Sequence, residues 1–109
     1  MSAITTHVLD TARGRPARGL AVRLDYEGAT LGRSTTDVDG RVRDLLPPDR
    51  KPAPGLYRLV FETGDWFAAT GVEAFYPQVS VDFRVRDGGE HHHVPLLLSP
   101  WGYSTYRGS

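Results

Sequence analysis

Histidines, one arginine and a hydroxyl-rich carboxyl end are the residues of this sequence best suited to chemistry. His91, His92 and His93 are consecutive, and His7 lies near the amino end. Histidine changes charge near neutral pH, so it can act as an acid, a base or a metal ligand. The residues from 91 to 109 combine three histidines with an apolar run and an aromatic end. Chain termini usually fray and carry little, so this concentration favours a functional role.

Residue type alone leaves several interpretations open. His91 and His93 share a strand face and could chelate a metal, but alternating histidines are common and no carboxylate or cysteine partner has suggestive spacing. A hydrogen-bonded or solvated histidine near a strand end is the simpler interpretation. An arginine just after a turn, such as Arg41, is more often a surface charge than an anion clamp, and a tyrosine such as Tyr106 is more often a strand aromatic than a ligand contact.

Short strands, separated by turns at regular intervals, must position these residues. Twelve glycines and eight prolines break the chain at short intervals, which favours an all-β sandwich or barrel. We expect a tight turn at 37–40, a proline-rich loop at 47–55, and a short helix over 66–70 capped by Asp65. The expected strands span 4–10, 20–26, 30–36, 41–45, 56–62, 79–86, 90–98 and 103–107.

The histidine strand has two partly apolar faces. Alternation puts His92, Val94, Leu96 and Leu98 in one row, which we expect to face the core. The opposite row holds His91, His93, Pro95 and Leu97, and should not face open water either. Proline cannot donate to a ladder, so Pro95 must lie where the missing N–H is tolerated. A sandwich has one core, so the second face suggests contact with another subunit, although scattered surface apolarity is common.

Composition narrows the classes of partner and compartment. The formal net charge is zero, so there is no electrostatic case for nucleic acid or an anionic membrane. The sequence has no cysteine, hence no disulfide framework, thiolate nucleophile or thiolate metal site. We expect one domain over residues 1–109, with no signal peptide, no membrane-spanning run and a cytoplasmic location.

Segments along nearly the whole chain resemble the transthyretin-like family, specifically its 5-hydroxyisourate hydrolase branch. Residues 6–17 (THVLDTARGRPA) resemble the family's opening motif, and 36–41 (TDVDGR) its central turn. Residues 55–61 and 75–77 fit its middle. The ending from 91 to 109 is similar to the most specific signature, whose final Tyr-Arg-Gly-Ser distinguishes hydrolases from the vertebrate hormone carrier.

The resemblance implies a β-sandwich of two four-stranded sheets with one short helix, and a homotetramer whose dimers meet across a channel. It implies that His7, Arg41, His93 and Tyr106 face this channel, and that Ser109 reaches the same site. His91 matches the first histidine of the motif but is given no catalytic role. His92 stands where a tyrosine is common in the family. Since its row faces inward, this departure concerns packing.

The implied activity is hydrolysis of 5-hydroxyisourate to 2-oxo-4-hydroxy-4-carboxy-5-ureidoimidazoline in urate degradation, without metal or other cofactor. Such a reaction needs a base for water, donors for an oxyanion and groups that orient a flat substrate. We expect His7 and His93 to position and deprotonate water, Arg41 to bind substrate oxygen, and Ser109 to assist proton transfer. Tyr106, Arg107 and Gly108 would hold the ring's polar edge.

Two other functions deserve comparison with this expectation. A carrier of a hydrophobic ligand should line its channel with apolar and small residues, whereas this channel would carry histidines, an arginine and a tyrosine. A metal protein built on His91 and His93 is the other alternative. Thyroxine binding would distinguish the carrier, and metal analysis with a chelator would distinguish the metal protein.

Overall fold

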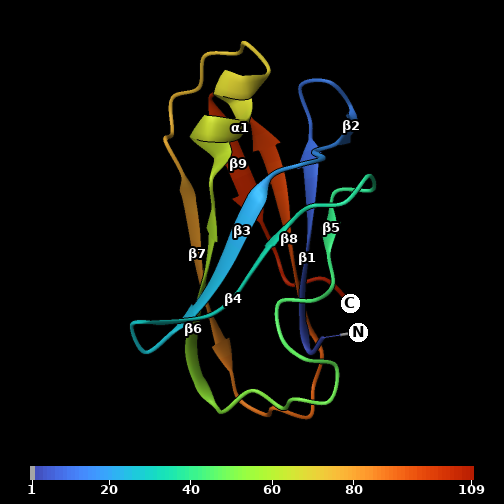
Figure 1. The fold of residues 1–109 in the computed structure, drawn as a ribbon, viewed down its shortest axis with the longest axis vertical. Helices are drawn as coiled ribbons and strands as arrows, with labels where there is room; N and C mark the ends of the chain where they lie inside the picture. The colour runs from blue at the N-terminus through green and yellow to red at the C-terminus, as the bar shows by residue number, and fades with distance from the viewer. Residues whose placement is uncertain (1) are drawn as a thin grey trace.

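The computed structural model describes residues 2–109 as two β-sheets packed face to face (Figure 1). One sheet has the order β2-β1-β8-β9, and β5 also pairs with β1; the other has the order β4-β3-β6-β7. The first comprises β1 (Ile4–Asp10), β2 (Arg15–Pro16), β5 (Arg41–Val42), β8 (His92–Ser99) and β9 (Gly102–Thr105). The second comprises β3 (Ala21–Tyr26), β4 (Ala29–Thr35), β6 (Gly55–Phe61) and β7 (Val79–Val85).

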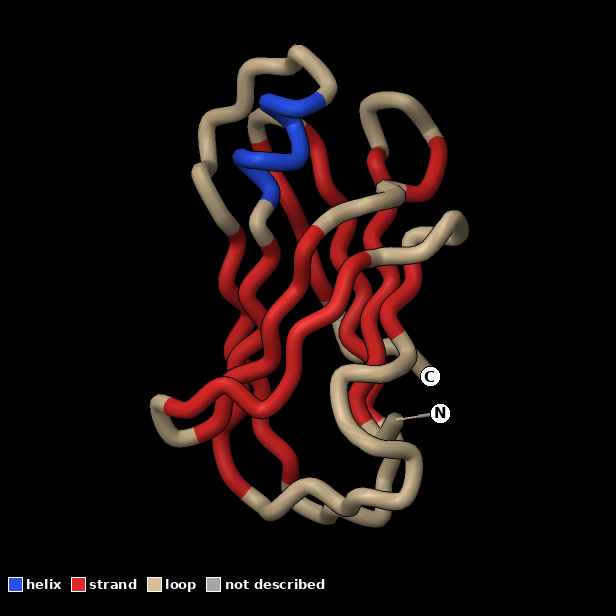
Figure 2. The backbone as a smooth tube through the Cα atoms, viewed as in Figure 1, coloured by secondary structure: helices blue, strands red, loops and turns tan. Residues whose placement is uncertain are grey.

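The expected β-sandwich of two sheets with one short helix is confirmed, with four strands in one sheet and five in the other. The two-residue strands β2 and β5 both pair with β1, at residues 9–10 and 6–7, and so share the place of one strand. The helix α1 (Thr63–Ala69) lies at one end of the sandwich (Figure 2) and is the only helix among residues 2–109. It begins earlier than expected: Glu62 is at the cap position, and Asp65 lies in the first turn without capping. No helix within residues 2–109 has the length and apolar character needed to cross a membrane.

Alternation along the strands builds the core between the sheets. The inward row of β8 is buried as expected, with Leu96 fully buried. It packs toward apolar residues of β3, β6 and β7, among them Leu24, Leu59 and Val79. Each fully buried Leu or Val contributes roughly 1.5–3 kcal/mol to folding relative to exposure. The outward row of β8 therefore stays on the far face of the sheet, where β1 flanks it.

Strand β9 ends earlier than expected because of Pro95. It pairs with β8 from Ser99 to Leu96 and stops at Thr105, instead of running on to Arg107. Pro95 is the next residue of β8 on this side and has no N–H to continue the ladder. Its carbonyl instead accepts from the Thr105 hydroxyl at 2.7 Å. The chain rejoins β8 only at Gly108, whose N–H donates to the carbonyl of His93 at 2.8 Å.

His92 places a titratable ring in the core. It is 4% exposed, its Nδ1 has no hydrogen-bond partner within residues 2–109, and its ring centroid lies 6.4 Å from that of Phe83. Burial, with the charge of Arg107 second, lowers the pKa of His92 below the ordinary 6.5. The imidazole is therefore neutral in the folded chain under conditions where the unfolded chain begins to protonate.

We expect His92→Phe to reduce the acid sensitivity of folding. Because the folded pKa is depressed, the unfolded chain binds more protons once the pH falls through about 6.5, so stability is lost in that direction. Removing the imidazole should reduce the slope of the free energy of unfolding against pH by up to about 1.4 kcal/mol per pH unit. Denaturant unfolding of both proteins between pH 8 and pH 5 measures it. An unchanged slope would show that His92 titrates as it does in the unfolded chain.

Candidate active site

The turn before β5 places Arg41 directly opposite His7. Asp37 Oδ1 accepts the N–H groups of Asp39 and Arg41, both at 2.9 Å, and these bonds hold the pKa of Asp37 below its usual range. Gly40 closes the turn at φ 76°, where a Cβ would come within 2.4 Å of the Val8 carbonyl oxygen. In the resulting antiparallel register His7 pairs with Arg41. The turn thus brings a guanidinium beside an imidazole.

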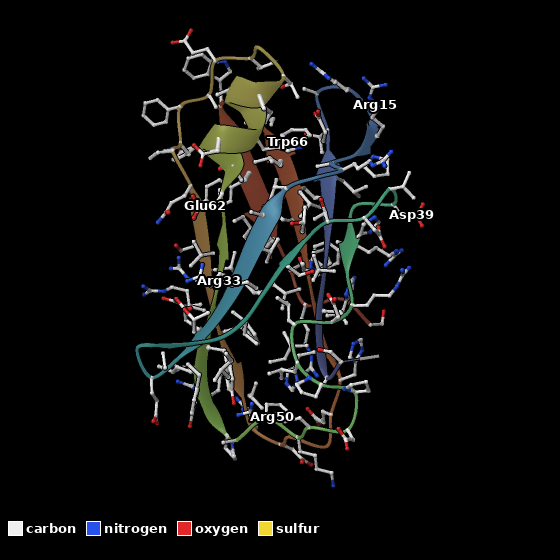
Figure 3. The ribbon with its side chains drawn as sticks, in the orientation of Figure 1. Arg15, Arg33, Asp39, Arg50, Glu62 and Trp66 are labelled. Atoms are coloured by element: carbon white, nitrogen blue, oxygen red, sulfur yellow. The ribbon has the colours of Figure 1, made fainter. Side chains whose placement is uncertain are left out.

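The same turn fixes the tautomer of His7. Its Nε2 lies 2.8 Å from the carbonyl oxygen of Asp39, which lies at the tip of the turn leading into β5 (Figure 3). A carbonyl can only accept, so Nε2 must carry the proton. In neutral His7 the Nδ1 lone pair is therefore left free. His7 is available to accept a proton or an N–H group from a ligand.

The parallel pairing of β1 with β8 brings Thr5 to His93. These residues are register partners, and Thr5 Oγ1 lies 2.8 Å from Nδ1 of His93. The same oxygen lies 3.0 Å from Nε2 of His91, and the two imidazoles stack with centroids 6.3 Å apart. Thr5 is 3% exposed, His93 is half-buried and His91 is exposed. With Nδ1 engaged, Nε2 is the nitrogen that His93 can offer to a ligand.

The carboxyl end of the chain closes over the ring of His93. Gly108 lies so close that a Cβ on it would be 2.6 Å from Cδ2 of His93. Next to this contact is a hollow of about 150 Å³, which we call the histidine hollow. It is lined by Thr5, Thr6, Arg41, Arg43, His91, His93 and Ser109.

The structure places the predicted residues at three positions. Arg41, His93 and Ser109 line the histidine hollow, and His7 lies beside it as the register partner of both Arg41 and Pro95. Gly108 packs against His93. Tyr106 and Arg107 instead line a different hollow, between β7 and β8. Tyr106 is 57% exposed there, and Arg107 lies 3.4 Å from both a carboxylate oxygen of Glu90 and the His91 carbonyl.

Burial and positive charge favour the neutral form of both site histidines. The pKa of His7 is lowered first by burial and then by Arg41. The pKa of His93 is lowered by burial, followed by Arg41, His91 and His7. An imidazole must be neutral to act as a base. Because the pKa of each ring is lowered, both rings stay neutral, and so able to act as bases, at a lower pH than a free histidine would.

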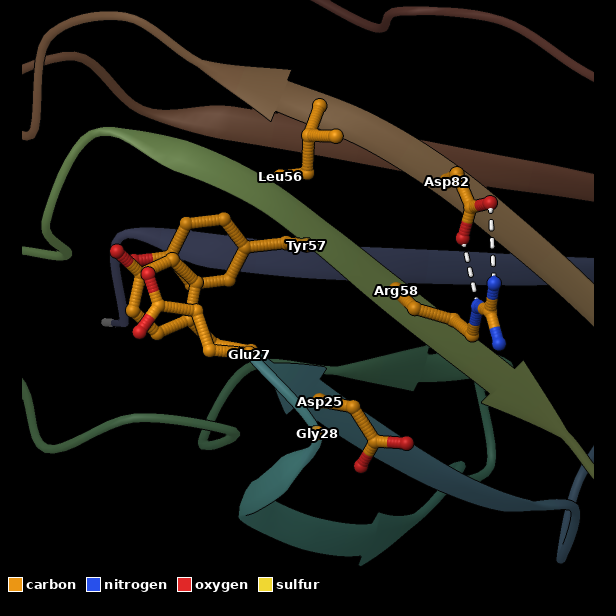
Figure 4. A pocket seen from close by; sticks show the side chains of 8 residues that line it. Asp25, Glu27, Gly28, Leu56, Tyr57, Arg58 and Asp82 are labelled. Carbon is orange, nitrogen blue, oxygen red and sulfur yellow. Dashed lines mark hydrogen bonds and ion pairs between the residues drawn. The ribbon is translucent and has the colours of Figure 1, made fainter.

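A larger hollow on the other sheet has its arginine and two of its three carboxylates held in ion pairs. It measures about 280 Å³ and is lined by residues such as Asp25, Tyr57, Arg58 and Asp82 (Figure 4). Arg58 donates to Asp82 at 2.7 Å and Arg23 to Asp25 at 3.0 Å. Ion pairs of this kind, at or near the surface, are ordinary features of a folded protein. The histidine hollow is therefore the better candidate for chemistry.

Sequence reasoning identified four residues of the hollow, Arg41, His91, His93 and Ser109, but missed Arg43, Thr6 and Thr5. Alternation along residues 4–10 puts Thr5 in the same row as His7 and Leu9, so the face on which Thr5 lies was predictable. Its place between two histidines depends on the parallel register of β1 and β8, which alternation alone does not give. No group of three or more His, Cys, Asp or Glu residues suited to hold a metal ion occurs within residues 2–109.

Comparisons with known proteins agree on one family. The family model described as "HIUase/Transthyretin family" matches residues 4–108. A 5-hydroxyisourate hydrolase 2 of Rhizobium meliloti is 50% identical over 114 residues, which cover 97% of this chain and 95% of that protein. The structure of Klebsiella pneumoniae 5-hydroxyisourate hydrolase matches with a TM-score of 0.89 and 40% identity, covering 97% of this chain and 98% of that one. Sea bream transthyretin in complex with thyroxine matches with a TM-score of 0.88 but 26% identity, covering 97% and 94%.

Proposed function

The chain belongs to the HIUase/transthyretin family, and we propose that it hydrolyses 5-hydroxyisourate to 2-oxo-4-hydroxy-4-carboxy-5-ureidoimidazoline in urate degradation. The observation that carries this proposal is the histidine hollow, where Arg41 and His93 meet beside His7. Identity to proteins named as hydrolases is also higher than identity to the thyroxine-binding transthyretin. The charged and hydrogen-bonding side chains that line the histidine hollow suit a polar substrate better than a hydrophobic one.

The proposed reaction begins with water held by His7 and His93. A neutral imidazole takes a proton from water as the oxygen attacks an acyl carbon of the substrate ring, and the resulting C–N cleavage opens the ring. Arg41 presents a planar, permanently charged fork to the oxygen on which negative charge develops. Ser109, at the edge of the same hollow, assists proton transfer. The proposal assigns no step to a metal or other cofactor.

We further propose that the whole chain acts as one domain within a cytoplasmic homotetramer. Leu9 and Leu97 are register partners on the outward face and are only partly covered within one chain. A second copy packed on this face would cover them and turn the hollow into part of a channel. Tyr106 and Arg107, which lie outside their own chain's hollow, would then contact substrate held by a neighbouring subunit. Sedimentation equilibrium of the full chain tests the tetramer.

An absorbance assay tests the activity directly. Freshly oxidised urate supplies 5-hydroxyisourate, whose disappearance is followed with and without the protein against its spontaneous decay. We expect clear acceleration by the wild-type chain and loss of this acceleration in His7→Ala, His93→Ala and a chain ending at Thr105. Folded variants that retain normal turnover would contradict the site, and thyroxine binding without turnover would favour a carrier.

Arg41 should set the acid limit of this activity. Because its charge lowers the pKa of His7 and His93, Arg41→Gln should raise both and move the acid limb of kcat/KM to higher pH. Loss of the guanidinium should also reduce kcat. Arg43→Gln is a matched control, since Arg43 lines the same hollow but pairs with Asp37 at 3.1 Å. If the acid limb of kcat/KM lies at the same pH in the wild type and in Arg41→Gln, Arg41 does not influence the pKa of the base.

A further inference from the structure

We propose that Thr5 is a positioning residue that links His93 to His91 as a proton relay. In this role Thr5 sets which nitrogen of His93 carries the proton, and moves positive charge from the half-buried ring to the exposed one. The proposal rests on two hydrogen-bond contacts of the buried Thr5 hydroxyl: its oxygen lies 2.8 Å from Nδ1 of His93 and 3.0 Å from Nε2 of His91. His91, left without a role by sequence reasoning, becomes the outer end of the relay.

The proton count of a hydroxyl gives the relay its direction. Thr5 has one hydroxyl proton, so it can donate to one imidazole and must accept from the other. The two ring nitrogens are the only hydrogen-bond partners of its side-chain oxygen within residues 2–109. If both rings donated to Thr5, its hydroxyl proton would be buried without an acceptor, which is unfavourable. One ring therefore presents N–H to Thr5, and the other presents a lone pair.

One of the two resulting arrangements makes His93 a base. In it, Nδ1–H of His93 donates to Thr5, the Thr5 hydroxyl donates to Nε2 of His91, and Nε2 of His93 has a free lone pair. After this Nε2 takes a proton from water, Nδ1–H passes to Thr5 as the Thr5 proton passes to Nε2 of His91. His93 is then neutral and His91 carries the positive charge. The reverse shift restores the proton for donation to the departing ring nitrogen.

The surrounding charges explain why such a transfer is useful. His93 is faced by Arg41 from β5, by His7 from β1 and by His91 on its own side of the sheet, with Ser109 at the edge. A positive charge on His93 is disfavoured by this cationic, partly buried setting. On His91 it would be solvated, because that ring is exposed. Moving the proton outward therefore stabilises the state in which water has been deprotonated.

Kinetics of matched variants test the relay, which rests on the proposed hydrolysis. Thr5→Val keeps the shape but removes the hydroxyl, and should lower kcat by about 10- to 100-fold with KM nearly unchanged. Thr5→Ser should restore kcat to within about threefold, since it keeps the hydroxyl. His91→Gln can still bond to Thr5 but cannot take a proton, and should lower kcat about tenfold. Thr11→Val, which loses a hydroxyl bonded to the Leu98 carbonyl, is the control.

Non-additivity separates a relay from packing. Because Thr5 and His91 act in series, the double variant should be no slower than Thr5→Val alone. Multiplicative losses, or an unaffected kcat in Thr5→Val or His91→Gln, would overturn the relay while leaving the hydrolase activity of the wild type intact. A wild type without hydrolase activity would instead overturn the proposed function.

Imidazole nitrogen NMR of the unliganded wild type gives a readout independent of turnover and of any variant's folding. At a pH where both rings are neutral, we expect Nδ1 of His93 to be protonated and Nε2 of His91 to carry a lone pair. Any other protonation of these two nitrogens would overturn the relay. Thr5→Val should release both rings to the tautomer mixture of a free histidine.

Discussion

His93→Asn should lower kcat for 5-hydroxyisourate hydrolysis by about 10²- to 10⁴-fold, the usual range for removal of a general base. Asparagine places a hydrogen-bonding atom near the position of Nδ1, so it can keep the contact with Thr5. It removes Nε2, the nitrogen that His93 offers to a ligand once Nδ1 is engaged at 2.8 Å. Folding should change little, because the histidine ring is only half-buried. Steady-state kinetics and thermal unfolding of the two proteins provide the comparison.

The adjacent histidine supplies the control. His92→Phe removes an imidazole from the same strand, but on the opposite face and within the core. Its kcat should stay within a few-fold of wild type, while its free energy of unfolding should depend less on pH than that of the wild type. If His93→Asn keeps wild-type kcat, the base must be sought at His7, whose Nδ1 lone pair is left free by the bond to Asp39. If the two variants lose activity equally, the loss does not come from the hollow.

The sandwich could be predicted because its signals are local. Alternation in β8 assigned the core-facing row correctly, including the burial of His92, since strand periodicity fixes which side chains share a face. The turn at 37–40 was equally visible, because aspartate accepts nearby N–H groups and glycine tolerates positive φ. A pattern contained within one strand or one turn was enough in both cases.

The parts of the site that could not be predicted depend on pairing between distant segments. Whether Thr5 meets His93 or a residue two positions away depends on the register of β1 against β8, and neither strand's own pattern sets that register. The end of β9 was mispredicted for a related reason. Pro95 interrupts the hydrogen-bond ladder from the neighbouring strand β8, so the sequence of residues 103–107 gives no sign of where β9 ends. That interruption accompanies the departure of Tyr106 from the face that holds His93.

Gly108→Ala should reduce kcat by about 100-fold, although alanine adds only a methyl group at the end of the chain. The new Cβ would lie 2.6 Å from Cδ2, 3.3 Å from Cγ and 3.4 Å from Cβ of His93. Real Cβ atoms do not approach other carbons as closely as 2.6 Å, so one of the two segments must move. The glycine is required for space and not for its backbone angle.

Either movement harms the proposed chemistry. The His93 ring is held through Nδ1 by Thr5, so turning it away breaks the 2.8 Å contact that orients Nε2. Displacing the tail, residues 106–109, instead breaks the hydrogen bond from the Gly108 N–H to the His93 carbonyl and moves Ser109 from the hollow. A misplacement of about 1 Å can cost about 10²-fold in rate. Residues 103–107 and 109 are exposed, so global stability should change by much less than activity.

Gly102→Ala is the matched control for this variant. Gly102 opens the strand that leads into the same tail, and an added Cβ there would meet only the Ser99 hydroxyl oxygen, at 3.9 Å. It should keep kcat and the histidine NMR signals close to wild type. For Gly108→Ala, lost activity should accompany a changed Nδ1 signal of His93 if the ring turns, or an unchanged one if the tail is displaced. Wild-type kcat in Gly108→Ala would show that catalysis does not depend on the tail lying against His93.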